Sequence, residues 1–349
     1  MRAVTKHIGS SHSAINKRLH PATCFQKILV CRPNHRLGNL LLVTPIIQEL
    51  VEAYPSSEID LFVKGSIAPE IFKNYSNIHK IIELPKKPAK ALIQYVNAWL
   101  SISRTSYDLV INVDRNSASG RLATKFANGR YKIFGAPPEQ SEPDLQAQHI
   151  AKYAVFEFRK FLSRLNSEIS SRQVPPLNLK LSKEEEQIGL KKLAKLIDHN
   201  RQTICLFTHA TGEKCYSESW WKSFYKRLKF EFPDFNIIEI LPIENISRLS
   251  FAAPTFYSKD IREIGSLIAN TRAFIGADSG MMHLANAVQT PTIGLFCVTS
   301  EKLYGPYGNH STGLNTCRCS TEDCIKILHD TLALTSAQEH SNEKRNLAC

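Results

Sequence analysis

The sequence predicts an α/β protein made of two Rossmann-like, doubly wound domains that face each other across a central cleft. Its 349 residues, 43% of them hydrophobic, are too many for one small core and suit two domains. Short runs of β-branched residues alternate with segments of helical period, which is typical of parallel sheets with right-handed helical crossovers. The alternation is interrupted at Val174-Pro175-Pro176, where we expect the link between the domains.

The order of strands and helices is similar in the two halves of the chain. The N-terminal half has four predicted strands, at residues 27–32, 56–63, 78–84 and 107–113, and helical patterns at residues 39–54 and 89–102. In the C-terminal half the predicted strands cover residues 203–208, 235–241, 272–276 and 292–296. The predicted helices there cover residues 182–197, 217–232, 260–270 and 279–288.

These elements divide the chain into four predicted parts. They are a flexible basic arm at residues 1–26, an N-terminal domain at 27–173, a C-terminal domain at 174–333 and a flexible tail at 334–349. The arm is basic because the first acidic residue of the chain is Glu49. The formal net charge of +12 favours either an anionic partner or simply solubility, and the arm is either a binding element or an inert leader.

The composition disfavours several classes of protein. No zinc-finger pattern, aromatic RNA-binding motif or dense basic run is present, so we expect no nucleic-acid partner. No segment approaches the roughly 18–20 continuous apolar residues of a membrane span. Nine cysteines, an odd number, in a chain that starts without a secretory signal favour reduced thiols and a cytoplasmic protein.

Three loops follow predicted strands at the edge of the sheet where doubly wound folds bind ligands, at residues 33–38, 209–214 and 277–280. In the last of these, Asp278, Ser279 and Gly280 turn a buried strand into a helix. The free N–H groups and dipole of such a helix start suit a phosphate. His283 lies about one turn further and is expected to point at the same anion. The alternative is an ordinary capped helix with a solvent-facing histidine.

The loop at residues 209–214 combines a hydroxyl, a glycine and a lysine, contributed by Thr211, Gly212 and Lys214. This combination suits a diphosphate, with Lys214 as a mobile positive charge on the leaving group. The spacing is not that of a Walker loop. The alternative is a glycine turn beside a solvated lysine.

The loop at residues 33–38 brings positive charge to the N-terminal domain through His35 and Arg36. Gly38 would start the next helix and permit a close approach of the backbone. The alternative is a strand-to-helix turn with exposed basic side chains.

Taken in this order, the three segments resemble glycosyltransferase family 9, the heptosyltransferase family. The family's signature D-[ST]-G-x-x-H-x-A is met by Asp278, Ser279, Gly280, His283 and Ala285. Its H-A-T…K…W run is matched by His209, Ala210, Thr211, Lys214 and Trp220. Its R-x-G-D segment and the apolar run that follows correspond to residues 36–45. The resemblance spans about residues 27–308.

The resemblance implies a GT-B fold and an inverting transferase that takes an ADP-sugar, with ADP-heptose as the expected donor, in its C-terminal domain. The donor contacts it implies are Thr211, Gly212, Lys214, Glu244, Lys259, Asp278, Ser279, Gly280 and His283. Of these, Glu244 would contact the nucleoside and Lys259 would lie at the edge of the adenine. Lys214 is also expected to act in catalysis, on the leaving diphosphate.

The acceptor implied by the resemblance is a lipid-linked glycan, the lipopolysaccharide core or a related bacterial surface glycan. The expected acceptor residues are His35, Arg36, Gly38, Asn39 and Arg115. The basic arm and a face containing Arg36, Arg115 and Arg121 favour a peripheral contact with the anionic inner membrane.

One position departs from the family pattern. The family has Asp, its proposed general base, where this chain has Asn39, and an amide cannot take up a proton at neutral pH. Asp114, at the end of the fourth predicted strand, is the best alternative base, with His35 behind it. The other alternative is that the chain has lost activity.

No D-x-D motif is present, so we expect Lys214, His283 and a helix start to neutralise the diphosphate without a metal. Cys317, Cys319 and Cys324 form a cluster that could bind zinc with a flanking His310 or His329, but reduced thiols are favoured. Trp220 and Trp221 are expected in the core. Two further functions remain open at this point: a sugar-nucleotide epimerase of similar architecture, and an inactive protein that binds anions or glycans.

Overall fold

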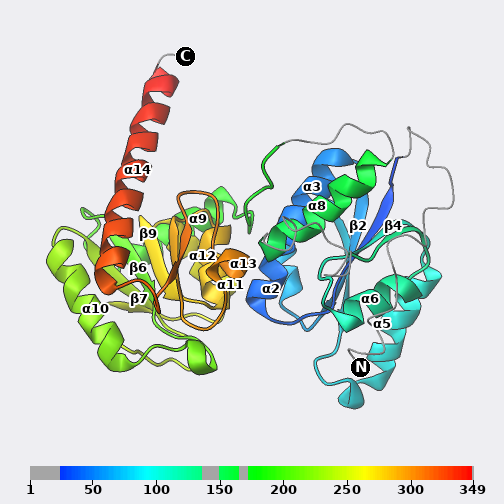
Figure 1. Cartoon of the computed structure of the whole chain (residues 1–349), viewed down its shortest axis with the longest axis horizontal. Coiled ribbons are helices and arrows are strands. Elements are labelled where there is room, and N and C mark those ends of the chain that lie inside the picture. Colours follow the sequence, from blue (N-terminus) through cyan, green and yellow to red (C-terminus); the bar gives the residue numbers. More distant parts are fainter. Residues whose placement is uncertain (1–23, 136–148, 165–171, 348–349) are drawn as a thin grey trace. The chain divides into compact units, whose positions relative to one another are not determined.

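The computed structural model describes residues 24–135, 149–164 and 172–347, and it describes side chains as far as Ala337 (Figure 1). The chain forms two compact units, Met1–Pro175 and Pro176–Cys349. The division falls two residues after the boundary that the sequence predicts. Most of the predicted basic arm, residues 1–23, lies outside the described residues.

The first unit is built on a parallel sheet with strand order β3-β2-β1-β4-β5 (Figure 1). Its strands are β1 (Lys27–Arg32), β2 (Glu58–Lys64), β3 (Ile78–Leu84), β4 (Tyr107–Asn112) and β5 (Gly129–Ile133). In the register, Ile28 lies beside Ile59 on one neighbour and Leu109 on the other, so apolar side chains stack across the centre. The edge strand β5 has no counterpart among the predicted strands, because Arg130 and Lys132 interrupt its apolar pattern.

The helices of the first unit cover both faces of this sheet (Figure 1). They are α2 (Leu37–Leu41), α3 (Thr44–Ala53), α4 (Ala68–Phe72), α5 (Leu92–Arg104), α6 (Ala118–Phe126) and α8 (Ile150–Ser163), with a short 3₁₀ turn η1 (Pro88–Lys90). Helices α5 and α6 cover one face and α3 packs with α8 on the other. The single helix predicted at residues 39–54 is two helices, because Pro45 lacks an N–H group and begins a new first turn.

The second unit contains a parallel sheet with strand order β11-β10-β9-β6-β7-β8. Its strands are β6 (Thr203–Phe207), β7 (Asn236–Ile240), β8 (Thr255–Phe256), β9 (Ala273–Ala277), β10 (Thr292–Phe296) and β11 (Thr312–Asn315). The two edge strands β8 and β11 are the shortest and were not expected from the apolar pattern. The four central strands coincide with the predicted ones to within two residues, because each is buried along most of its length.

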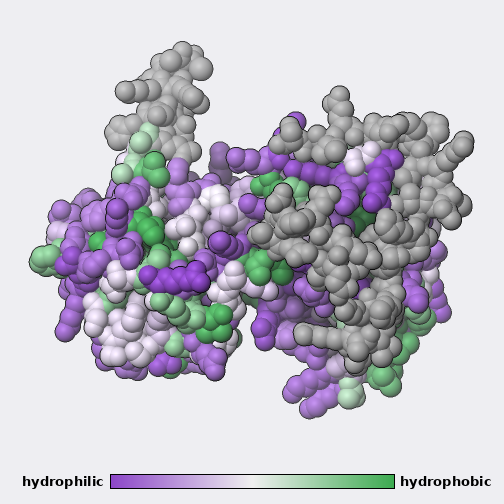
Figure 2. All heavy atoms as spheres, in the orientation of Figure 1, coloured by the Kyte–Doolittle hydropathy of each residue, from purple (hydrophilic) through white to green (hydrophobic). Residues whose placement is uncertain are grey.

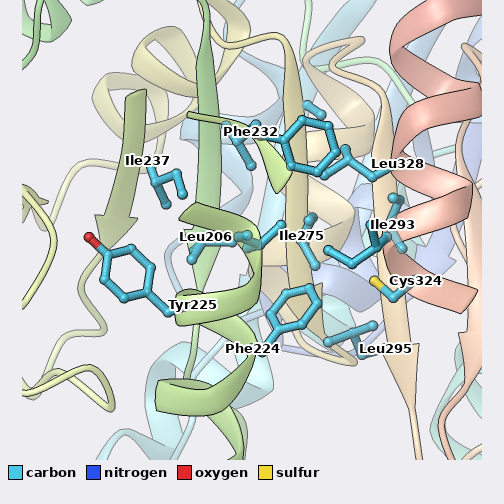
Figure 3. Packing of buried hydrophobic residues seen from close by; sticks show 14 of the residues in the cluster. Leu206, Phe224, Tyr225, Phe232, Ile237, Ile275, Ile293, Leu295, Cys324 and Leu328 are labelled. Carbon is cyan, nitrogen blue, oxygen red and sulfur yellow. The ribbon is translucent and has the colours of Figure 1, made fainter. Parts of the chain in front are cut away.

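The helices of the second unit are α9 (Lys183–Leu193), α10 (Glu218–Glu231), α11 (Ile261–Ala269), α12 (Gly280–Ala287), α13 (Glu301–Tyr304) and α14 (Thr321–Leu347), with a 3₁₀ turn η3 (Gly212–Lys214). Figure 3 shows Leu206, Ile275 and Ile293 of the sheet facing Phe224 of α10 and Leu328 of α14. Helices α10 and α14 therefore cover one face of the sheet, and α11 and α12 pack together away from that cluster.

Three glycines stand side by side across β9, β10 and β11, where Gly294 pairs with Gly276 on one side and Gly313 on the other. A Cβ atom on Gly294 would lie 2.4 Å from the sulfur of Met282 in α12. The absence of a side chain at Gly294 lets α12 lie close to the sheet.

Two further predictions concern the tryptophans and the tail. Trp221 is fully buried, whereas Trp220 is only partly buried and packs against it with ring centroids 5.0 Å apart. Residues 334–347, expected to be a flexible tail, instead continue α14, whose start is held in the core by Cys324 and Leu328.

Among the described residues, no helix is both long and apolar enough to cross a bilayer.

Candidate functional site

The candidate donor site of the second unit begins where the fully buried strand β9 ends. The backbone N–H of Asp278 donates to the Leu295 carbonyl at 2.9 Å, which continues the sheet one residue beyond β9. The Ser279 hydroxyl then accepts from the backbone N–H of Met282 at 3.5 Å and caps α12. The remaining first-turn N–H groups of α12, beginning at Gly280, have no partner within the helix, as at any helix start.

The central contact of this site is an ion pair between Lys214 and Asp278, with Nζ to Oδ2 at 2.6 Å. The hydroxyl of Thr299, a residue that the sequence did not single out, donates to the same carboxylate oxygen. Asp278 is 8% exposed, while the side chain of Lys214 is 31% exposed. Asp278 is therefore held and partly neutralised by its neighbours, and Lys214 faces solvent from the same place.

His283 differs from its expected role as a positive group. It is buried, and burial lowers the pKa of its imidazole to about 4, an effect that the Asp278 carboxylate opposes and the Lys214 ammonium reinforces. Its Nδ1 atom is buried without a hydrogen-bond partner among the described residues. The ring is therefore neutral at pH 7. It can offer a hydrogen bond but no charge, which corrects both the expected charge neutralisation and the solvent-facing alternative.

The loop that carries Lys214 is open to solvent. Thr211 and Gly212 are exposed, and a Cβ atom on Gly212 would meet nothing within 4 Å. The glycine is needed for its φ of +62°, a left-handed conformation, rather than for space. This loop therefore presents an exposed hydroxyl and an exposed glycine next to the partly exposed ammonium group of Lys214.

The two expected nucleoside contacts lie outside this network. Glu244 and Lys259 are exposed, and the described residues show no hydrogen bond or ion pair that joins either of them to Asp278. Asp260, next to Lys259, caps α11 by accepting from the N–H groups of Arg262 and Glu263. One oxygen of the Asp260 carboxylate therefore already accepts hydrogen bonds from the helix backbone.

A buried acid in β7 was missed by the sequence analysis. Glu239 has no exposed surface and accepts from the Thr208 and Ser247 hydroxyls, both at 2.5 Å. Burial raises the pKa of Glu239, while the two hydroxyls lower it. An acidic residue inside the apolar run NIIEI was the available signal. Its side chain ties the end of β6 to the turn after β7.

The first unit brings together two residues that the sequence analysis proposed separately, Asn39 and Asp114. The buried guanidinium of Arg32 donates from Nη1 to Asp114 Oδ2 at 2.5 Å and from Nη2 to Asn39 Oδ1 at 3.0 Å. The other Asp114 oxygen accepts from the backbone N–H of Asn116 at 2.9 Å. Arg32 itself was not among the expected site residues. It connects the end of β1 with α2 and with the turn after β4.

The remaining acceptor candidates, His35, Arg36, Gly38 and Arg115, differ in their exposure and in their contacts. His35 and Arg36 are exposed, and Gly38 is buried in α2. The pKa of His35 is lowered by burial and by the positive charges of Lys64, Lys86 and Arg36. The Arg115 guanidinium lies over the Tyr153 ring, 4.8 Å from its centroid. The loop after β1 is thus a concentration of positive charge.

The three clustered cysteines do not share one site. Cys324 is buried in the core at the start of α14, where burial raises the pKa of its thiol to about 12. Cys317 is exposed and its sulfur lies 3.4 Å from the Cys297 carbonyl oxygen. His329 packs on Phe232, with ring centroids 4.4 Å apart. Within the described part of the chain, no three His, Cys, Asp or Glu side chains are grouped so that they could hold a metal ion.

Two parallel, doubly wound units with strand-end loops define a GT-B-type fold, and the comparisons with known structures agree. The structure of a glycosyl transferase family 9 protein from Veillonella parvula superposes with a TM-score of 0.72 at 15% identity, covering 91% of this chain and 99% of the other. The Escherichia coli heptosyltransferase WaaC with ADP gives a TM-score of 0.64 at 16% identity, covering 88% and 100%. At these identities the likeness concerns the fold.

Sequence comparisons find similarity to one family of glycosyltransferases. Residues 258–331 match the model of glycosyltransferase family 9 (heptosyltransferase). Lipopolysaccharide heptosyltransferase 3 of Escherichia coli is 22% identical over 291 residues, covering 78% of this chain and 84% of that protein. Lipopolysaccharide heptosyltransferase 1 of Salmonella typhimurium is 22% identical over 340 residues, covering 84% and 95%. These similarities support the assignment to glycosyltransferase family 9 that the motifs suggest, and they favour a glycosyltransferase over the epimerase alternative.

Proposed function

We propose that this protein transfers heptose from ADP-heptose onto the lipopolysaccharide core or a related bacterial surface glycan, with inversion and without a metal. The observation that carries the proposal is the Lys214–Asp278–Thr299 network at the start of α12. Relatives of the chain are named lipopolysaccharide heptosyltransferases, and a protein of similar fold is described with ADP. The proposal places the enzyme in the cytoplasm, in peripheral contact with the anionic inner membrane that carries its acceptor.

The donor diphosphate is proposed to bind between Lys214 and the first turn of α12. Lys214 holds Asp278 through a single partly exposed contact, so its flexible side chain can turn to a phosphate oxygen. The helix start offers backbone N–H groups and the positive end of a dipole. Asp278, left with the Thr299 hydroxyl, then accepts hydrogen bonds from sugar hydroxyls. Neutral His283 contributes a hydrogen bond rather than charge.

Loss of the diphosphate requires that negative charge be stabilised as the bond to the anomeric carbon breaks. Lys214 supplies a full positive charge at that place, and the helix dipole adds to it. These two groups do the work that a metal does in transferases of another kind. The metal-independent part of the proposal rests on them.

Proton transfer from the acceptor hydroxyl is proposed to use Asp114. A carboxylate has about four lone-pair sites, and here Arg32 and the Asn116 N–H occupy two of them. The side chain remains 18% exposed, so an acceptor hydroxyl can reach the others. Asn39, held by the same guanidinium, orients that hydroxyl without taking its proton.

The test is a donor screen on the whole chain, with melting temperature and transfer measured for ADP-, UDP- and GDP-sugars. A donor at a hundredfold excess over its Kd adds about 2.7 kcal/mol to the free energy of unfolding, so ADP-heptose is expected to raise the melting temperature most, with or without EDTA. Lys214→Gln should lower kcat by about 10²–10³-fold, as for other losses of a transition-state charge partner. Lys222→Gln, an exposed lysine of α10 paired with Glu218, is the matched control. A preference for UDP-sugars, or activity abolished by EDTA and restored by Mg²⁺, contradicts the proposal.

A second candidate function rests on Asn39. If Asp114 cannot act as the base, the chain is a donor- or glycan-binding protein without turnover. ADP-heptose would then stabilise the protein while no transfer or donor hydrolysis is detected over long incubation. The same donor screen therefore separates the two functions.

A further inference from the structure

The outer surface of α5 and α6 in the first unit exposes apolar side chains that the proposed reaction does not use. Leu92, Ile93 and Val96 of α5 are 63%, 79% and 45% exposed, and Leu122 and Phe126 of α6 are 40% and 51% exposed. We call these five side chains the outer α5/α6 face. Figure 2 shows apolar surface where Figure 1 draws these two helices, next to hydrophilic side chains.

The five side chains form one surface rather than isolated residues. Val96 lies one turn before Trp99 on α5, and the Trp99 ring contacts the Phe126 ring of α6 with centroids 5.7 Å apart. Leu122 lies one turn before Phe126 on the same side of α6. The opposite sides of the helices already bury Ala98, Ile102 and Ala123 against the sheet, so core packing does not need the outer side chains. A contiguous exposed apolar patch of this kind marks an interaction surface.

The segment of the chain that carries the outer α5/α6 face is strongly basic. Residues 84–135 contain nine basic residues but only two acidic ones, Asp108 and Asp114. Both acids are occupied, since Asp108 accepts from the backbone N–H groups of Gln26 and Lys27 and Asp114 pairs with Arg32. The nine basic residues are Lys86, Lys87, Lys90, Arg104, Arg115, Arg121, Lys125, Arg130 and Lys132.

The position of the lysines relative to the apolar side chains indicates the kind of partner. Lys87 and Lys90 are exposed in the turn immediately before α5, and Lys125 is exposed next to Phe126. Apolar side chains rimmed by lysines suit a bilayer interface, where the apolar groups enter the acyl boundary and the ammonium groups stay among the headgroups. An anionic leaflet attracts each such lysine.

We infer that the outer α5/α6 face binds the surface of an anionic lipid bilayer. Positive charge also surrounds the predicted acceptor loop of the same unit, since Lys86 acts on His35. Binding by this face would hold that loop at the surface where a lipid-linked glycan is presented. This last consequence rests on the proposed function, whereas the lipid contact itself does not.

The test measures flotation of the full chain with vesicles of phosphatidylcholine alone or mixed with phosphatidylglycerol, without donor or glycan. The wild type should float with the anionic vesicles, and increasingly less as salt rises. Ile93→Glu should weaken binding by about tenfold or more, because it replaces an inserted apolar group with a charge that the leaflet repels. Lys87→Gln with Lys90→Gln should weaken it by about tenfold or more and reduce the salt dependence.

Matched controls come from the second unit. Phe230→Glu changes a side chain of α10 that is 74% exposed, and Lys191→Gln with Lys226→Gln removes two other exposed lysines. All variants should keep the melting temperature of the wild type. If Ile93→Glu binds anionic vesicles as well as Phe230→Glu does, the inference is wrong and binding belongs to another part of the chain. It is equally wrong if the wild type does not float but forms a dimer that Ile93→Glu dissociates.

A transfer assay with a delipidated, water-soluble acceptor separates this inference from the proposed function. Ile93→Glu should match the wild type there and lose rate only with acceptor embedded in vesicles. Loss of rate in both assays would place the residue in folding or catalysis and contradict the lipid contact. Vesicle binding without any transfer by the wild type would leave the lipid contact standing and refute the proposed function.

Discussion

The two units hold a basic side chain against a carboxylate at the same kind of place, the end of a central parallel strand, but they do so differently. In the second unit, Lys214 reaches Asp278 through one contact and keeps a side chain that is 31% exposed. In the first unit, the Arg32 side chain is 6% exposed and divides its two terminal nitrogens between Asp114 and Asn39.

The difference indicates which pair can be released. A lysine is a point charge on a flexible stem and can exchange one oxygen partner for another, whereas a buried guanidinium with two fixed partners is bound by its geometry. The second unit is therefore suited to a charged ligand that displaces Asp278 from Lys214. The first unit is suited to holding two polar side chains still while a neutral hydroxyl meets them.

The largest expected effect concerns the base. Asp114→Asn should lower kcat by about 10²–10⁴-fold, the usual contribution of a positioned general base, because the amide still meets Arg32 but cannot take the proton. Asn39→Asp is the companion variant and places a second carboxylate on Arg32. Rate and melting temperature are measured together. A folded Asp114→Asn enzyme with nearly normal kcat removes Asp114 from the mechanism, and a large gain from Asn39→Asp shows that the usual base position is intact but unoccupied.

The second expected effect is a difference in the free energy of unfolding between variants of the two ion pairs. Arg32→Gln should lower the free energy of unfolding by about 3–5 kcal/mol, because it leaves the Asp114 carboxylate partly buried without its charge partner. Lys214→Gln should lower it by at most about 1 kcal/mol, since that pair is partly exposed. Urea denaturation of both variants and of the wild type measures these two losses in the free energy of unfolding. Equal losses in the two variants would mean that the pairs do not differ in the way their burial indicates.

The third expected effect is a pH dependence of stability that arises in the second unit. Because the folded-state pKa of His283 lies near 4, below its ordinary 6.5, the unfolded chain binds this proton more readily. The His283 contribution is therefore fully present above about pH 6.5 and is lost between about pH 6.5 and 4, by roughly 3 kcal/mol in total. The difference in unfolding free energy between wild type and His283→Gln should show this slope. Lys191→Gln, at an exposed lysine of α9, is the control and should keep the wild-type slope.

The sequence predicted what depends on local pattern. Each fully buried central strand appears as an apolar run, and the signature from Asp278 to His283 identified a strand end and a capped helix. The edge strands β5, β8 and β11 were missed because their apolar pattern is short or interrupted by charge, whereas the edge strand β3 was predicted. The break between α2 and α3 depends on Pro45, which a count of apolar positions alone does not register.

Contacts between residues that lie far apart in the sequence could not be predicted from such patterns. Arg32 meets Asp114 across 82 positions, and Thr299 meets Asp278 across 21, so neither pair has a spacing that a motif could encode. The charge state of His283 also depends on burial by the whole unit rather than on its neighbours in the chain. The sequence therefore predicted the residues of the candidate donor site more completely than the partners of those residues.

The glycine at position 294 sets the distance between α12, which begins the candidate donor site, and the sheet. Because a single methyl group on Gly294 would meet the Met282 sulfur, Gly294→Ala should push α12 away from the sheet. It would move the helix start relative to Thr299 and Lys214 while leaving every polar group of the site chemically unchanged. Increasingly large side chains at position 294 should therefore weaken donor affinity in steps, because they change the distance between the start of α12 and the side chains of Thr299 and Lys214. None of the residues proposed to contact the donor would be replaced.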